Sequence, residues 1–146
     1  MILYNNSTMK KKVLVFGAFD VFHFGHFFFL KEAKKEGKLF VVVARDETVK
    51  KLKGKKPILG EKKRKKIIEM IGLAEKVFLG DKKDPFKIIK KIKPDIICLG
   101  YDQKFFVDDL KKFLKKEKLP IKIKRIKSFL PNIFKSSFYA PSKKQT

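Results

Sequence analysis

Short runs of apolar residues alternate with longer stretches of helical periodicity along this chain of 146 residues. The runs are rich in Val, Ile, Leu and Phe, which is typical of strands that are buried on both faces of a parallel sheet. We expect strands over the segments 12–17, 38–44, 74–80, 95–100 and 121–126. We expect helices between them, over 24–37, 61–72, 85–93 and 108–119. This alternation predicts one α/β domain, with a five-stranded parallel sheet and helices on both faces.

Turn-forming residues mark several of the expected boundaries. Gly37 is expected to end the first helix, and the lysine-bearing segment 46–57 is expected to be a polar connection. Asp84 and Pro85 are predicted to be the N-cap and first turn of the third helix, which Pro94 ends. For the core, we expect burial of the strand segments and of most of the first helix's apolar stretch, namely 13–16, 39–44, 96–99 and 27–30.

The length and composition allow one compact domain with a hydrophobic core, since 44% of the residues are hydrophobic. We expect this domain over residues 9–140, with flexible ends at 1–8 and 141–146. The single cysteine, Cys98, lies in an apolar run, which favours a buried thiol over a chemical role. No apolar run is long enough to span a bilayer, and the N-terminal segment does not resemble a secretory signal, so we expect a cytoplasmic protein.

The charge is strongly positive, with 38 Lys and Arg residues against 15 Asp and Glu residues and a formal net charge of +23. Such a charge raises the expectation of nucleic-acid binding. The lysines, however, are spread over every polar face and form no arginine-rich arm, which favours ordinary solvated surfaces. A basic nucleic-acid-binding α/β module without catalysis stays open as an alternative of another class. In both cases the positive field attracts anionic ligands such as nucleotides.

The only two histidines, His23 and His26, lie where the first expected strand gives way to the first helix. This is the carboxyl edge of a strand, where open α/β sheets bind ligands. A helix start offers free N–H groups and the positive end of its dipole to an anion. Gly25 lets the backbone approach a phosphate closely, and both histidines can face it as hydrogen-bond donors. The arrangement predicts charge stabilisation on a phosphoryl group.

The sequence GAFDVFHFGH, residues 17–26, resembles the G-T-F-D-x-x-H-x-G-H motif of the cytidylyltransferase-like nucleotidyltransferases. These are small Rossmann-like proteins that join a nucleotide to a phosphate-bearing acceptor. Ala18 is the one departure from the motif, because the family usually has threonine there. The resemblance runs along the chain from Met9 and includes the later segments ARDETVKKLKG, EKKR and FKSSFYA.

This resemblance implies a set of site residues, in which one lysine and one arginine face the histidines across the phosphates. The implied catalytic residues are His23, His26, Lys53 and Arg64. The implied nucleotide-binding residues are Ala18, Phe19, His23, Phe24, Gly25, His26, Gly100, Asp102, Ser136 and Ser137. Asp46 is implied in substrate binding. Asp20 either holds a metal ion through water or caps its own loop, two interpretations of equal weight.

The segment PDIICLGYDQKF, residues 94–105, separates two branches of the family. It is similar to the P-D-I-I-x-L-G-Y-D-Q-K-F of the archaeal FAD synthases, which use ATP and FMN. Glycerol-3-phosphate cytidylyltransferases, which use CTP and tend to carry G-D-D-W there, are the alternative. The FAD synthase branch implies an in-line attack of the FMN phosphate on the α-phosphorus of ATP, with a divalent cation such as Mg²⁺. Family members commonly pair, so the resemblance also allows a homodimer.

Overall fold

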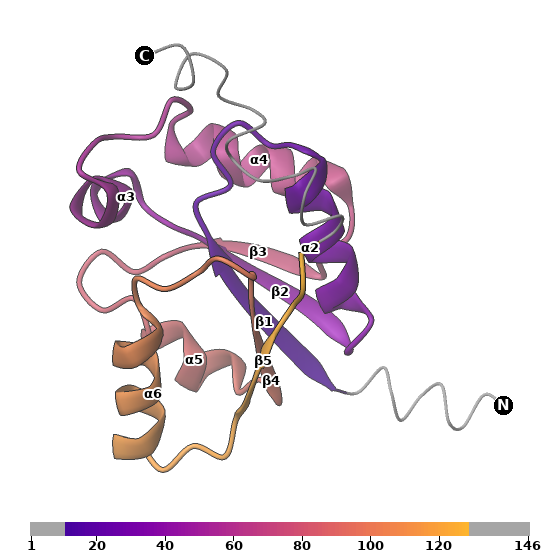
Figure 1. Ribbon diagram of the computed structural model, residues 1–146, viewed down its shortest axis with the longest axis vertical. Helices are drawn as coiled ribbons and strands as arrows, with labels where there is room; N and C mark the ends of the chain where they lie inside the picture. Colours follow the sequence, from indigo (N-terminus) through magenta and orange to yellow (C-terminus); the bar gives the residue numbers. More distant parts are fainter. Residues whose placement is uncertain (1–10, 129–146) are drawn as a thin grey trace, which may run out of the picture.

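Five parallel strands form one sheet with the spatial order β3-β2-β1-β4-β5 (Figure 1). The computed structural model describes residues 11–128. The strands are β1 (Lys12–Gly17), β2 (Lys38–Val43), β3 (Lys76–Leu79), β4 (Ile96–Leu99) and β5 (Lys122–Arg125). The helices are α2 (Phe24–Lys34), α3 (Asp46–Lys53), α4 (Glu61–Ile71), α5 (Lys87–Ile92) and α6 (Val107–Lys116). The predicted parallel α/β architecture is confirmed.

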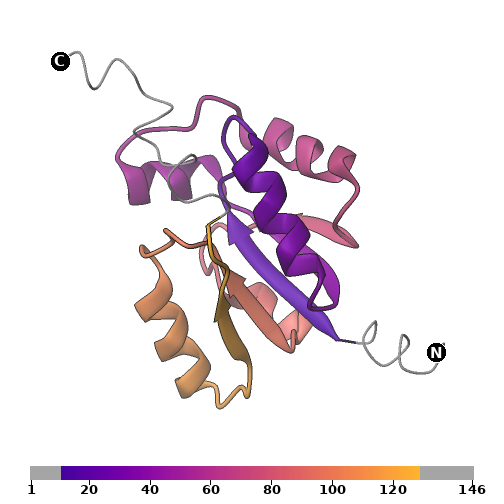
Figure 2. The same cartoon turned by 45° about the vertical axis from the view of Figure 1, so that its right-hand side comes forward.

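Helices cover both faces of the sheet, and each face has its own core (Figures 1 and 2). Alternate strand residues point to opposite faces, so β1 contributes to both cores. Helices α2 and α4 cover one face, whose core includes Val13, Val15, Leu30, Leu39 and Ile68. Helices α5 and α6 cover the other face, whose core includes Leu14, Phe16, Ile89, Ile97 and Leu110. Cys98 is fully buried in the first of these cores, and burial raises the pKa of its thiol to about 11, as expected of an inert structural thiol.

The strand order reverses direction at β1, which pairs with β2 on one side and with β4 on the other. Val15 is opposite Val41 in the first pair and opposite Cys98 in the second. The carboxyl ends of β1 and β4 therefore lie beside each other, and the chain leaves them toward opposite faces. Such a reversal opens a crevice in which α/β proteins bind their ligands.

One expected connection is a helix. We predicted a polar connection over 46–57, but its first part forms α3 and ends at Gly54, which has a positive φ of 83°. Acidic residues in the first turn and lysines in the last turn complement the helix dipole. Only Val49 is buried from this helix, with Leu52 half exposed at its end, so the apolar periodicity was too sparse to predict it.

Two helix boundaries that a glycine or a proline was expected to set differ from the prediction. Helix α2 ends at Lys34 rather than at Gly37. Gly37 has a φ of +153°, and a Cβ there would lie 2.5 Å from the carbonyl oxygen of Lys11, so the glycine permits a close approach of two backbones. Helix α5 begins at Lys87, two residues after Pro85. Asp84 still accepts a hydrogen bond from the N–H of Phe86 at 3.1 Å, which fixes the turn before the helix.

The apolar stretch 27–30 of α2 is only partly core. Leu30 is fully buried, and Phe28 and Phe29 are half-buried against the same core. Phe27 is also half-buried, and its ring stacks on that of the exposed Phe24 at 6.0 Å between centroids. The phenylalanines at the start of α2 are thus divided between the core and the surface.

Candidate active site

The two histidines form a reciprocal cap at the start of α2. His23 is the N-cap residue, and its Nδ1 accepts a hydrogen bond from the N–H of Gly25 at 3.0 Å. Nδ1 of His26 accepts one from the N–H of His23 at 3.3 Å. The two rings stack with centroids 3.8 Å apart and planes inclined by 20°. Because Nδ1 is an acceptor in both rings, the neutral form of each carries its proton on Nε2.

Both imidazoles have a lowered pKa. Burial lowers the pKa of His26 to about 4, with further contributions from the nearby charges of His23 and Lys53. The rings of Phe19 and Phe22 lie 5.5 Å and 5.4 Å from that of His26 and supply apolar surroundings. Burial also lowers the pKa of His23, against the opposing charge of Asp102. Both side chains are therefore neutral near pH 7 before any ligand arrives.

Two glycines of the motif make room for rings. A Cβ at Gly25 would lie 2.8 Å from Cε1 of His23, so only glycine allows that ring to cap the helix. A Cβ at Gly17 would lie 2.6 Å from Cε2 of Phe19. The loop between β1 and α2 is also strained, since Phe19 and Val21 have positive φ values of 53° and 47°. The motif sequence thus specifies an unusual turn that presents the histidines.

The histidines line a cavity of about 390 Å³, which we call the histidine cavity. It lies at the carboxyl ends of β1 and β4, as predicted for the site. Predicted residues on its wall are Ala18, Phe19, Asp20, His23, Gly25, His26, Lys53, Gly100 and Asp102. Phe19 is 5% exposed, so its ring mainly packs against the ring of His26. Phe24 is absent from this wall, because its half-exposed ring stacks on Phe27.

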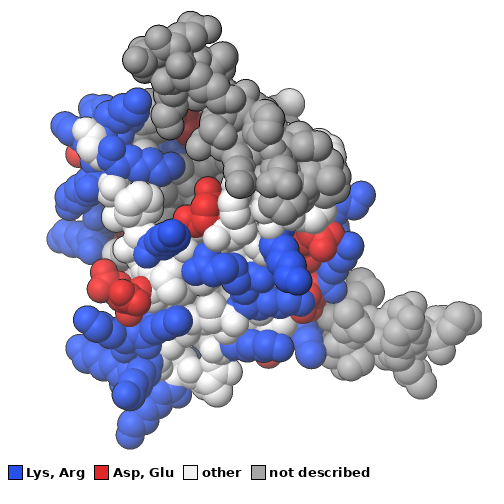
Figure 3. Space-filling view, viewed as in Figure 1, with Lys and Arg blue, Asp and Glu red and all other residues white. Residues whose placement is uncertain are grey.

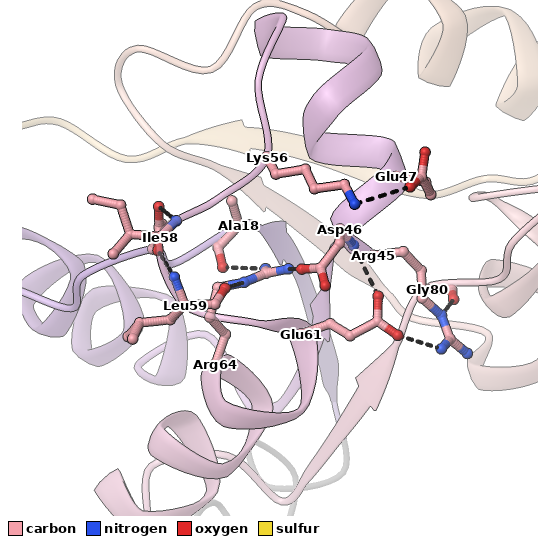
Figure 4. A network of polar contacts seen from close by, with 11 residues as sticks. Ala18, Arg45, Asp46, Glu47, Lys56, Ile58, Leu59, Glu61, Arg64 and Gly80 are labelled. Atoms are coloured by element: carbon pink, nitrogen blue, oxygen red, sulfur yellow. Dashed lines mark hydrogen bonds and ion pairs between the residues drawn. The ribbon is translucent and has the colours of Figure 1, made fainter.

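Arg64 is placed differently from the prediction. Its side chain is fully buried, and its guanidinium donates to three protein oxygens (Figure 4). Nε donates to the carbonyl of Leu59 at 2.8 Å, and Nη1 to that of Ala18 at 2.8 Å. Nη2 pairs with the carboxylate of Asp46 at 2.7 Å. Arg64 and Asp46 therefore join the histidine loop to α3 and do not line the histidine cavity, although Asp46 lies on the wall of another cavity. Their contacts with phosphate and substrate stay predictions.

A second ion pair supports the same junction (Figure 4). Glu61, at the first position of α4, accepts the N–H of Asp46 at 2.8 Å and pairs with Arg45 at 2.9 Å. The hydrogen bond from Asp46 is the main reason that the pKa of Glu61 is lowered. Arg45 also donates to the carbonyl of Gly80 after β3 at 2.7 Å. The start of α3, and through the helix the position of Lys53, is therefore fixed from two sides.

Asp20 fastens the histidine loop to the segment before α4. Its two carboxylate oxygens accept the N–H groups of Ile58 at 2.8 Å and Leu59 at 2.9 Å. Burial raises the pKa of Asp20, but these N–H groups and the charge of Arg64 outweigh it, so the pKa is lowered. The geometry supports the loop-capping interpretation. Within residues 11–128, no three His, Cys, Asp or Glu side chains are grouped closely enough to hold a metal ion.

Two residues that the prediction did not assign hold the β4 end of the site. Gln103 accepts the N–H of Gly100 at 2.7 Å and donates to the carbonyl of Phe16 at 2.8 Å, which ties β4 to β1. Arg125 donates to the carbonyls of Gly100 at 2.6 Å and Gln103 at 2.8 Å. Gln103 is part of the segment PDIICLGYDQKF, whereas Arg125 had no sequence signal. Ser136 and Ser137 lie outside the described residues.

The comparisons with known proteins agree with this geometry. A family profile described as Cytidylyltransferase-like matches residues 14–143. The FAD synthase of Methanothermobacter marburgensis is 44% identical over 123 residues, which is 82% of this chain and 76% of the relative. The FAD synthase of Methanosphaera stadtmanae is 48% identical over 117 residues, which is 77% of this chain and 78% of the relative.

Solved structures share the fold. The lipopolysaccharide core biosynthesis protein from Thermoplasma volcanium GSS1 has a TM-score of 0.75 and 42% identity, and the match covers 82% of this chain and 98% of that one. The pantoate-beta-alanine ligase from Francisella tularensis has a TM-score of 0.58 and 15% identity over 97% of this chain and 73% of that one, which shows the fold alone. No helix within residues 11–128 is long and apolar enough to cross a membrane. With its reciprocal histidine cap at the switch point and its matching profile, the chain belongs to the cytidylyltransferase-like family.

Proposed function

We propose that this protein is an FAD synthase, which transfers AMP from ATP to FMN and gives FAD and pyrophosphate. The observation that carries the proposal is the identity of 44–48% to FAD synthases over about four fifths of the chain. The histidine cavity supports it, because it joins a helix start, two imidazole donors and a lysine in one cavity of about 390 Å³. The predicted choice of this branch over the glycerol-3-phosphate cytidylyltransferases agrees with those relatives.

The reaction needs no protein nucleophile. A phosphate oxygen of FMN attacks the α-phosphorus of ATP, a new P–O bond forms, and the bond between the α-phosphorus and the bridging oxygen of pyrophosphate breaks. The protein's part is to align the two phosphates and to stabilise the charge on the α-phosphate oxygens and the leaving group. We assign this task to Nε2–H of His23 and of His26, to the positive end of the α2 dipole, whose first N–H groups are held by the histidine cap, and to the ammonium of Lys53.

A divalent cation, which we infer to be Mg²⁺, would neutralise part of the triphosphate charge. Mg²⁺ keeps several waters and is usually bound by one or two carboxylates together with substrate phosphates. Asp102 and Asp20 are the carboxylates that line the histidine cavity, and Asp20, whose two oxygens already accept N–H groups, would hold the ion only through water. The ion would therefore be held chiefly by the nucleotide.

Nucleotide choice is assigned to the loop after β4. Gly100 and Asp102 line the histidine cavity beside the end of β1. Gln103 and Arg125 fix the peptide groups of Gly100, so the loop presents a preformed wall. The carboxylate of Asp102 can accept a hydrogen bond from a base amine or a ribose hydroxyl. Gly100 leaves space for a purine, which is wider than cytosine.

One set of incubations tests the function. The protein is mixed with Mg²⁺ and each combination of ATP or CTP with FMN or glycerol 3-phosphate, and pyrophosphate and the nucleotide product are measured. We expect FAD and pyrophosphate from ATP and FMN alone. Turnover of CTP with glycerol 3-phosphate, without turnover of ATP with FMN, would transfer the assignment to the alternative branch.

The nucleic-acid alternative predicts salt-sensitive binding without turnover. On the face shown in Figure 3, Lys and Arg side chains are spread widely, with Asp and Glu between them, which supports a solvated surface. Absence of turnover in every incubation, together with RNA or DNA binding that weakens steeply with salt, would favour this alternative. We also infer a cytoplasmic location and a homodimer, and sedimentation analysis of the purified protein tests the dimer.

A further inference from the structure

A second cavity shares a wall with the histidine cavity. It has a volume of about 310 Å³ and lies between α3 and the segments that lead into α5 and α6. The residues common to the two cavities are Phe16, Gly17, Ala18, Lys53, Asp102 and Gln103. Two ligands that occupied the two cavities would therefore meet at the end of β1, beside Lys53.

The second cavity is mainly apolar and aromatic, and we call it the aromatic cavity. Phe86, Phe105 and Phe106 line it from the α5 and α6 side, and Val49 and Leu52 line it from α3. The rings of Phe86 and Phe106 contact each other at 6.3 Å and form a fixed wall. Leu52 and Phe105 are 40% and 64% exposed, and both line this one cavity. Two exposed apolar groups at one rim indicate a ligand with a flat apolar body.

The charges around the aromatic cavity balance one another. Asp81, Asp102 and Asp109 lie on its wall, and so do Arg45, Lys53 and Lys104. Backbone N–H groups of Asp84 and Lys83 lower the pKa of Asp81, so this carboxylate remains ionised. Arg45, also on the wall, is already paired with Glu61. A neutral ring system with an N–H donor fits this lining better than a polyanion does.

We propose that the aromatic cavity binds the isoalloxazine ring of FMN, an inference that rests on the proposed function. The volume lies at the lower end of the range for small-molecule sites, about 300–1,000 Å³. The FMN phosphate then lies at the shared wall, where Lys53 offsets its charge. ATP occupies the histidine cavity, with its pyrophosphate on the histidine side and its α-phosphorus toward the shared wall. The attacking oxygen and the leaving group are thereby on opposite sides of the α-phosphorus, as in-line displacement requires.

The test compares substitutions at the rim of the aromatic cavity with one elsewhere. The full chain is prepared with Phe105→Ala, with Leu52→Ser and, as a control, with Met70→Ala. Met70 is an exposed apolar residue on α4 that lines neither cavity. FMN affinity is measured from flavin fluorescence in the presence of an ATP analogue that cannot be cleaved between its α- and β-phosphates. The affinity for that analogue is measured separately. All three positions are at least 40% exposed, so the variants retain the fold.

We expect the Phe105 variant to weaken FMN binding about tenfold and the Leu52 variant several-fold, with the affinity for the ATP analogue changed less than about twofold. The Met70 variant should match the unaltered protein in both. Lumiflavin, which is the flavin ring without the ribityl phosphate, should displace FMN but not the ATP analogue.

Unchanged FMN affinity in both rim variants would overturn the assignment of this cavity, and so would lumiflavin that displaced the ATP analogue. Neither outcome would affect the proposed function if the unaltered protein makes FAD. An unaltered protein that bound FMN but formed no FAD would overturn the proposed function alone. One that bound no FMN would overturn both.

Discussion

Replacing Arg64 by methionine separates a structural role from contact with phosphate. Methionine has a similar length and fills the buried space with an apolar side chain, so the main loss is the guanidinium. That group makes hydrogen bonds of 2.8 Å to Leu59, 2.8 Å to Ala18 and 2.7 Å to Asp46. Without it, the histidine loop is no longer tied to the start of α3.

The cost can be estimated from these contacts. Removal of one partner from a buried ion pair costs about 3–5 kcal/mol, because the other charge and the remaining acceptors lose their donors. The Asp46 side chain retains 33% exposure, so water can partly solvate its carboxylate in the variant. We therefore expect the lower part of that range, about 3 kcal/mol in the free energy of unfolding. Since small domains have about 5–15 kcal/mol, the variant should still fold.

Urea unfolding followed by far-ultraviolet circular dichroism measures this change. A Lys65→Met variant is the matched control, since Lys65 is next in sequence and makes a surface pair with Glu69 at 3.0 Å. It should lose less than about 0.5 kcal/mol. Arg64→Lys keeps the charge but not the three-donor fork, so it should also lose stability. A stable Arg64→Lys variant with a KM for ATP raised more than about tenfold would refute the structural role and restore the phosphate contact.

Three further predictions concern the groups that line the histidine cavity. The His26→Ala variant should lower kcat about 10²–10³-fold with little change in ATP affinity, because the histidine meets most charge in the transition state; equal losses in both would indicate simple binding. The free energy of unfolding should change with pH between 6.5 and about 4 because of His26. The pKa of His26 in the folded protein, about 4, lies below the ordinary 6.5, so the unfolded chain takes up the proton first as the pH falls. This contribution, about 3 kcal/mol, is complete above pH 6.5 and is lost as the pH falls to about 4. Urea unfolding at several pH values, of the protein and of His26→Gln, checks it, and an equal pH dependence of the unfolding free energy in both would contradict it. The Asp102→Ala variant should raise the KM for ATP without changing the melting temperature, and an unchanged KM would exclude Asp102 from nucleotide binding.

The fold could be predicted because strand burial is a local property of the sequence. Segments such as the one from Leu39 to Val43 are apolar throughout, and only a sheet covered on both faces accommodates them. The position of the site at the end of β1 followed from the same pattern. Helix α3 could not be predicted in this way, because Val49 is its one buried residue and, apart from Leu52, its other residues are polar. The roles of Gly25 and Gly17, which leave space for rings, depend on the tertiary structure.

The prediction for Arg64 shows where motif reasoning stops. A motif position indicates that a residue type matters, but not which group it contacts. In a chain with 38 basic residues, nothing in the sequence distinguishes a buried arginine from a solvated one. Burial of Arg64 depends on Ala18, Asp46 and Leu59 arriving from separate segments to satisfy its donors. That convergence is a property of the tertiary structure, and it also explains why Lys53, at the far end of the same helix as Asp46, reaches the histidine cavity.

The groups assigned to the reaction stand at the ends of β1, β4 and α3, where strand pairing has stopped and the backbone would otherwise be free to move. Three side chains provide hydrogen bonds where the backbone hydrogen bonds between strands have ended. Gln103 bridges the ends of β1 and β4, Arg64 bridges the histidine loop and α3, and Asp20 holds that loop to the segment before α4. Each of the three contacts backbone groups, and Arg64 reaches α3 through the carboxylate of Asp46, so the direction of the chain is fixed while other side chains face the cavity. In this reaction the main task of the protein is to place the phosphates precisely. Loss of one of these positioning contacts should therefore lower kcat as much as loss of a histidine does.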